Sequence, residues 1–227
     1  MLVRMNEGLA ARDQVGVFDF ALQRVLYKTL GFGAGTDNMI IYPARDLDVD
    51  FWHGAWTEGF VDMRGERNIP LVYYKDQLYS RLVYTFVSNH DDDGLMKMYG
   101  KTEEARGYQD EGFVSWTRIV PAYFIVLLLP GIPCVWGAHF YWFKELETLI
   151  QLRNYLKIQP GARMEVDARP VREGVITWRI FGADNTRYTC AVIGPSAGLS
   201  KLPAPLELVF ELKTYDAAKP FLLHVYL

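Results

Sequence analysis

Residues 85–91, TFVSNHD, carry an apolar strand-like segment that ends abruptly in three polar side chains, Asn89, His90 and Asp91. In parallel α/β proteins of the barrel type, functional side chains lie where strands end, at the carboxyl face. Amide, imidazole and carboxylate groups together can bind hydroxyls or take part in acid–base chemistry. The run therefore predicts a parallel strand whose carboxyl end forms part of a functional site.

Three strand–helix units follow one another in the first 160 residues. Their predicted strands and helices cover residues 16–20, 22–30, 82–87, 113–129, 131–137 and 142–156. In the last helix Phe143, Leu146 and Leu149 lie on one apolar face, and the charged Arg153 is expected elsewhere. Alternating strands and helices predict parallel strands joined by right-handed crossovers, in a doubly wound sheet or a barrel.

The pattern changes at Pro160-Gly161, where helical periodicity is lost. Short apolar runs follow, separated by Gly, Pro, Asp and Asn; they cover residues 175–181, 188–194, 206–212 and 221–227. Such runs predict a small antiparallel β domain of about five strands. The fold class is therefore α/β followed by antiparallel β, with domains at 1–160 and 161–227.

Composition excludes several classes of function. With 24 Lys and Arg against 27 Asp and Glu, the net charge of −3 leaves no basic patch for nucleic acid. Cys134 and Cys190 fit two buried thiols and no disulfide framework. Residues 119–136 are uncharged, but three prolines argue against a membrane span. With no signal peptide in view, a cytoplasmic location is expected for the chain as given.

Several of these segments resemble, in order, the α-amylase family of glycoside hydrolases. Residues 17–20 (VFDF) resemble its sixth barrel strand, 86–91 (FVSNHD) its seventh and 130–136 (PGIPCVW) its eighth. Residues 146–154 resemble the closing helix, and 134–161 are most similar to the plant-type branch. The resemblance covers about residues 16–195 and implies part of a (β/α)8 barrel, strands six to eight, before the β domain.

The resemblance implies a retaining hydrolase of α-1,4-glucans such as starch, glycogen and maltooligosaccharides. Asp91 would stabilise the transition state by accepting hydrogen bonds from two sugar hydroxyls, and His90 would donate to another. Asn89 would orient its neighbours, and His139, after the eighth strand, would contact substrate. Hydroxyl contacts that strengthen in the oxocarbenium-like transition state are what such a reaction requires.

The nucleophile and the general acid would come from the fourth and fifth strands, and nothing before residue 16 matches those strands. Glu7 is the nearest substitute, but it lies in a helix-prone stretch. Three parallel strands cannot close a barrel and would leave an open edge and a bare inner face. We therefore expect a truncated product, or a chain completed by a complementary N-terminal half or by another copy of itself.

Other interpretations remain open. The chain could be a non-catalytic carbohydrate-binding remnant, with Trp52 and Trp56 among its sugar contacts, or a structural protein on an amylase scaffold. A flavodoxin-like domain is the alternative fold. No cofactor or transition metal is expected; acidic residues 46–50 could ligate calcium, but the rest of a calcium loop is absent, so calcium is not assigned. His53 and His224 have no partner in the sequence.

Overall fold

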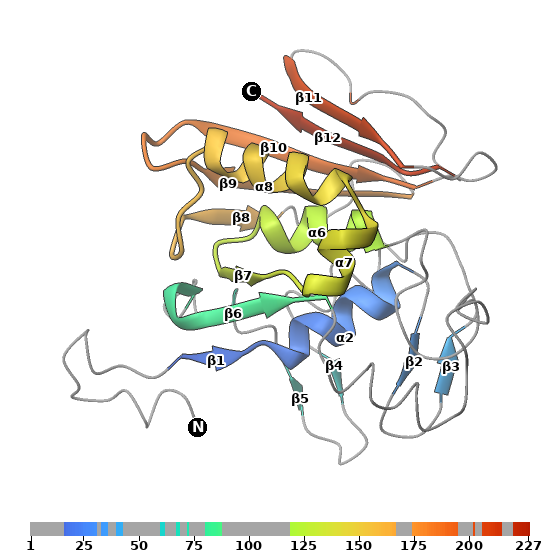
Figure 1. Ribbon diagram of the computed structural model, residues 1–227. Coiled ribbons are helices and arrows are strands. Elements are labelled where there is room, and N and C mark those ends of the chain that lie inside the picture. The colour runs from blue at the N-terminus through green and yellow to red at the C-terminus, as the bar shows by residue number, and fades with distance from the viewer. Residues whose placement is uncertain are drawn as a thin grey trace, which may run out of the picture.

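The computed structural model of the chain describes residues 16–30, 33–35, 40–42, 60–61, 67–68, 72, 80–87, 119–166, 174–194, 202, 206–214 and 220–227. Figure 1 shows the main elements in layers, with α6 (Ile119–Leu127) and α8 (Glu145–Tyr155) between three parallel strands and a larger antiparallel sheet. The structure thus combines helices and strands, which confirms the α/β fold class predicted from the sequence.

The parallel sheet consists of β1 (Val17–Phe18), β6 (Val83–Phe86) and β7 (Ile132–Cys134), in the order β1-β6-β7. Both pairings are parallel, and Tyr84 lies opposite Phe18 on one side and Ile132 on the other. The three strands predicted from the sequence are confirmed in place and in direction. Two short ribbons pair β2 (Gly33–Gly35) with β3 (Ile40–Tyr42) and β4 (Phe60–Val61) with β5 (Arg67–Asn68).

The two faces of the parallel sheet differ sharply. On one face Val83, Thr85 and Val87 are fully buried, and Val83 and Val87 share a hydrophobic core with α2 (Phe20–Thr29) and α6. On the other face the ring of Phe18 lies 5.4 Å from Tyr84 and 5.6 Å from Phe86. There Phe18 is 54% exposed and Tyr84 36%. One face is thus covered by helices, and the other presents partly exposed aromatic rings.

The helix predicted over 142–156 is confirmed as one helix, which begins at Glu145 rather than at Trp142, and a short helix that the sequence did not predict precedes it. The short α7 (Gly137–Trp142) ends at Phe143, whose backbone is extended (φ −116°, ψ 96°), and α8 begins at Glu145. The break turns the Phe143 side chain into the core, where it is buried. No described helix is long and apolar enough to cross a membrane.

Arg153 is buried, so its predicted place outside the apolar face of its helix is wrong. Its guanidinium donates hydrogen bonds to three backbone carbonyls, those of Leu127, Leu129 (2.8 Å) and Gly131 (2.9 Å). The last carbonyls of a helix have no partner within the helix. Arg153 supplies donors to the C-terminal end of α6 and to the turn that leads into β7. Burial lowers the pKa of Arg153 to about 10, which leaves it charged at neutral pH.

The antiparallel sheet has five strands, in agreement with the about five predicted from the sequence, and their order in the sheet is β11-β12-β10-β9-β8. The strands are β8 (Met164–Val166), β9 (Val175–Phe181), β10 (Arg187–Ile193), β11 (Leu208–Lys213) and β12 (Leu222–Tyr226). Trp178 joins this sheet to α6, because its Nε1 donates to the Leu128 carbonyl (3.1 Å) and its ring lies 5.8 Å from Phe124. One core therefore continues across the predicted domain boundary.

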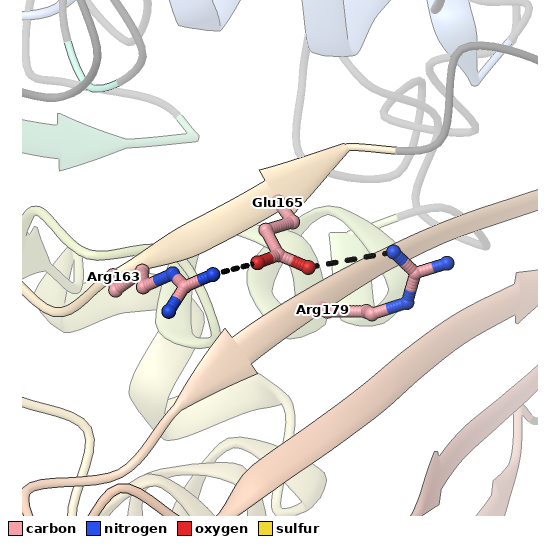
Figure 2. A network of polar contacts seen from close by, with 3 residues as sticks. All are labelled: Arg163, Glu165 and Arg179. Carbon is pink, nitrogen blue, oxygen red and sulfur yellow. Dashed lines mark hydrogen bonds and ion pairs between the residues drawn. The ribbon is translucent and has the colours of Figure 1, made fainter.

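An ion-pair network lies along β8 and β9. Figure 2 shows Glu165 between two arginines: Arg163 donates to one carboxylate oxygen, and Arg179 lies 3.4 Å from the other. Glu165 and Arg179 are directly opposite each other in the antiparallel register. The Arg163 side chain is 70% exposed, so the network is screened by solvent and contributes little to stability.

Candidate functional site

The carboxyl ends of the three parallel strands are the candidate site. Asp19 follows β1, Val87 follows β6 and Trp136 follows β7. Because the strands are parallel neighbours, these ends lie at the same edge of the sheet. The predicted site residues Asn89, His90 and Asp91, and also Trp52, Trp56 and His53, lie outside the described residues. His139 is described and lies in α7, just beyond β7.

Asp19 has a structural role at this edge. Its Oδ1 accepts from the backbone N–H of Leu22 (3.0 Å) in the first turn of α2, and its Oδ2 accepts from that of Val72 (2.9 Å). The first arrangement is an N-cap, in which a side-chain oxygen accepts from an orphan helix N–H. Asp19 is also fully buried. It therefore anchors α2 and a segment distant in the sequence.

His139 lies in an aromatic cluster beside the end of β7. Its ring centroid lies 4.8 Å from Trp136, 5.6 Å from Tyr123, 6.0 Å from Phe143 and 6.3 Å from Trp142. Its Nδ1 is 3.0 Å from the Tyr123 hydroxyl, which also accepts from the backbone N–H of Trp136 (3.1 Å). Burial lowers the pKa of His139 to about 4, so the ring is neutral at physiological pH.

We expect His139 to make the protein less stable as the pH falls from 6.5 to about 4. Its pKa drops from the ordinary 6.5 to about 4 on folding, because burial disfavours the charged ring. In this range the unfolded chain binds a proton that the folded chain does not, so the free energy of unfolding rises with pH. The full loss is about 3 kcal/mol.

Urea unfolding of the wild type and of His139→Phe, at several pH values from 4 to 7, measures this contribution. As the pH rises from 4 to 7, the free energy of unfolding of the wild type should increase by about 3 kcal/mol relative to that of the variant. A difference that stays constant with pH would show that His139 does not titrate in this way.

His224 has a defined environment that the sequence did not indicate. It is fully buried, its Nδ1 lies 2.7 Å from the Tyr226 hydroxyl, and its Nε2 lies 3.0 Å from a Glu211 carboxylate oxygen. The Tyr226 hydroxyl also accepts from the backbone N–H of Leu202 (2.9 Å). His224 and Tyr226 are two residues apart on one strand, so their side chains share a face of the sheet. This spacing is the sequence signal from which their contact could have been predicted. The position of Glu211 depends on the pairing of β11 with β12.

The two thiols have environments that do not favour reactivity. Both are free; Cys190 is buried, whereas Cys134 on β7 is partly exposed, so only one of the two expected buried thiols is fully enclosed. Burial raises the pKa of both thiols, which disfavours the nucleophilic thiolate. Among the described residues no group of three or more His, Cys, Asp or Glu side chains is placed to hold a metal ion.

Tyr123 is the residue of this site that the sequence did not single out. It lies within an apolar helical run, where its hydroxyl gives no separate signal, and it meets His139 only because α6 and α7 pack together. Neither a scan against protein-family models nor a search of curated proteins found a match for this chain. The geometry and the sequence motifs therefore carry the functional argument.

Proposed function

We propose that this chain contributes the C-terminal part of an α-amylase-type (β/α)8 barrel and its following β domain, and that it acts on α-1,4-glucans. The observation that supports this most is the order β1-β6-β7, in which three parallel strands lie beside one another in chain order. Barrel strands six, seven and eight have this arrangement. The motif of residues 86–91 begins on the last residue of β6, the middle strand.

The aromatic face of the parallel sheet supports the same proposal. In a closed barrel the strand faces that point away from the helices form a packed interior. Here that face carries Phe18 and Tyr84, which are partly exposed, and Phe86, which is buried. Parallel sheets are ordinarily covered on both faces. Further β/α units, from a complementary N-terminal half, would cover these rings and supply a neighbour on the side of β1 where no described strand pairs with it.

In this proposal the residues of the chain stabilise the transition state, and the nucleophile and the acid come from the complementary half. Asp91 would accept hydrogen bonds from two ring hydroxyls and His90 would donate to a third, with Asn89 orienting them. Such contacts accelerate the reaction when they are stronger in the oxocarbenium-like transition state than in the ground state. The two reacting carboxyl groups of a retaining enzyme lie about 5–5.5 Å apart.

Complementation tests the proposal directly. The chain is co-expressed with the first five β/α units of a plant-type α-amylase, and hydrolysis of a blocked nitrophenyl maltoheptaoside is followed. We expect activity from the pair and from neither part alone. Asp91→Asn should lower kcat by about 100-fold or more, because a neutral amide stabilises the developing positive charge less well.

Asp93→Asn is the matched control, since it removes a carboxylate from the same acidic run and should leave kcat within about twofold. A complex that forms without activity, together with starch binding that His90→Ala abolishes, would favour the carbohydrate-binding remnant instead. If no complex forms and the chain binds no sugar, both the hydrolase proposal and the carbohydrate-binding alternative are contradicted. Immunodetection of the β domain in source cells adds an independent check, because a mass well above 26.1 kDa indicates a longer enzyme.

A further inference from the structure

Strand β11 forms one edge of the antiparallel sheet (Figure 1). It pairs with β12 on one side, and among the described residues no strand pairs with its other side. It has six residues, whereas β8, the strand at the opposite edge, has three. Backbone N–H and C=O groups along a sheet edge can pair with a further strand. The edge along β11 is therefore a candidate interaction surface.

The backbone groups of Glu211 and Lys213 are directed away from β12. Thr214 donates its N–H to the carbonyl of Phe221 (3.0 Å), so Thr214 is one of the residues that bond to the β12 side. In an antiparallel pair, residues that bond to the partner strand alternate with residues whose groups point the other way. Lys213 and Glu211 lie one and three residues before Thr214, in a regular stretch of the pairing. Their N–H and C=O groups are therefore available along the outer edge.

The side chains of β11 alternate between the core and solvent. Phe210 and Leu212 are partly buried and pack against the main hydrophobic core, whereas Glu211 and Lys213 are exposed. One carboxylate oxygen of Glu211 lies 3.0 Å from His224 Nε2, and half of the Glu211 side chain remains exposed. None of the ion pairs between described residues includes Lys213. The edge thus presents an acidic and a basic side chain, two residues apart on one face.

This pair of charges is complementary to its own copy. When two identical strands pair antiparallel about a two-fold axis, residues at equal distances from the central residue lie opposite each other. With Leu212 at the centre, Glu211 of each copy lies opposite Lys213 of the other, and all of these residues direct backbone groups toward the partner strand. Opposite charges that face each other across two strands stabilise the pairing, and like charges destabilise it.

The neighbouring registers lack this match. A centre at Glu211 or at Lys213 places two like charges opposite each other, which is unfavourable. A centre at Phe210 sets Glu207 opposite Lys213, but Glu207 exchanges both of its backbone hydrogen bonds with Leu227. The register centred at Leu212 therefore combines matched charges with available backbone groups.

We propose that two copies of this chain associate through β11, antiparallel and with Leu212 at the two-fold axis, so that their antiparallel sheets become continuous. Bulges and lysines ordinarily protect a sheet edge from pairing. Here the irregularity in pairing lies between Leu208 and Phe210, before the paired stretch, and Lys213 faces a carboxylate. Pairing of one short strand buries little surface, so we expect a Kd of about 10–100 µM. The surface belongs to the β domain and does not depend on the proposed action on glucans.

Sedimentation velocity of the full chain over about 5–500 µM measures this association. Lys213→Glu and Glu211→Lys should each raise the Kd about tenfold or more, because each places like charges opposite each other at two positions. An equimolar mixture of the two variants should recover the dimer, since every carboxylate of one variant then faces an ammonium group of the other.

Two further substitutions are matched controls for the change in net charge. Lys144→Glu alters an exposed lysine at the start of α8, and Glu207→Lys alters an exposed glutamate just before β11. Both should leave the Kd within about twofold. Far-ultraviolet circular dichroism verifies the fold of every variant. If Glu211→Lys misfolds, Lys213→Pro takes its place, because it removes an N–H directed to the outer edge and should abolish the dimer.

Several outcomes would overturn the proposal. A chain that sediments as a monomer over the whole concentration range has no such interface. A dimer that persists in Lys213→Glu and in Lys213→Pro forms through another surface. A mixture of the two charge variants that stays monomeric, or a dimer lost in Glu207→Lys, refutes the register centred at Leu212.

Discussion

Replacing Arg153 with methionine is expected to lower the free energy of unfolding by about 3–5 kcal/mol. The guanidinium donates to the carbonyls of Leu127, Leu129 and Gly131, all in a region from which water is largely excluded. Methionine fills the space of the aliphatic stem but leaves these acceptors without their donors. Because they lie between α6 and β7, the loss should loosen the connection that positions His139. Urea unfolding followed by circular dichroism measures the change.

Two further substitutions distinguish the hydrogen bonds of Arg153 from its charge. Arg153→Lys retains the charge but not the planar set of donors, and we expect an intermediate loss. Arg163→Met removes an arginine whose side chain is 70% exposed and should change stability by less than about 1 kcal/mol. Equal losses in Arg153→Met and Arg163→Met would contradict the buried role of Arg153.

Trp178→Ala is expected to destabilise the protein by about 3–5 kcal/mol, the usual range for deleting a buried aromatic ring. Trp178 is fully buried, contacts Phe124 and donates to the Leu128 carbonyl. The substitution leaves a cavity between the antiparallel sheet and α6 and removes a hydrogen bond. Because one core includes both regions, we expect the unfolding of helices and of the sheet to coincide.

Trp178→Phe separates packing from hydrogen bonding, since it keeps an aromatic ring and loses Nε1. We expect a smaller loss of about 1–3 kcal/mol for this variant. Near-ultraviolet and far-ultraviolet circular dichroism should give the same midpoint. If two separate unfolding transitions appear and Trp178→Ala shifts only one of them, residues 1–160 and 161–227 unfold independently.

The positions of the parallel strands could be predicted because their signals are local. Residues 82–87 and 131–137 are short apolar runs ended by polar residues or glycine, and strands β6 and β7 lie within them. Strands β9 and β10 likewise coincide with predicted alternating runs that are bounded by turn residues. In each case the pattern of burial along the chain suffices to identify the element.

The break between α7 and α8 could not be predicted in this way. Residues 142–156 have helical spacing throughout, but α8 begins only after Phe143, whose backbone is extended and whose ring is buried in the core. The candidate site shows the same limit: the sequence indicates His139, but not the Tyr123 hydroxyl that lies 3.0 Å from its Nδ1. That contact requires α6 and α7 to be packed against each other.

The sequence by itself therefore determined the positions of the parallel strands β1, β6 and β7 and of the strands β9 to β12, but not the ribbons β2–β3 and β4–β5 or the short α7, because periodicity and turn residues act over a few neighbouring positions. Only the tertiary structure decided where the polar side chains go. Arg153 is buried because three carbonyls from the preceding helix and turn meet its guanidinium. Strand register places Glu211 opposite the buried His224. Such partners are brought together by packing, which local sequence patterns do not encode.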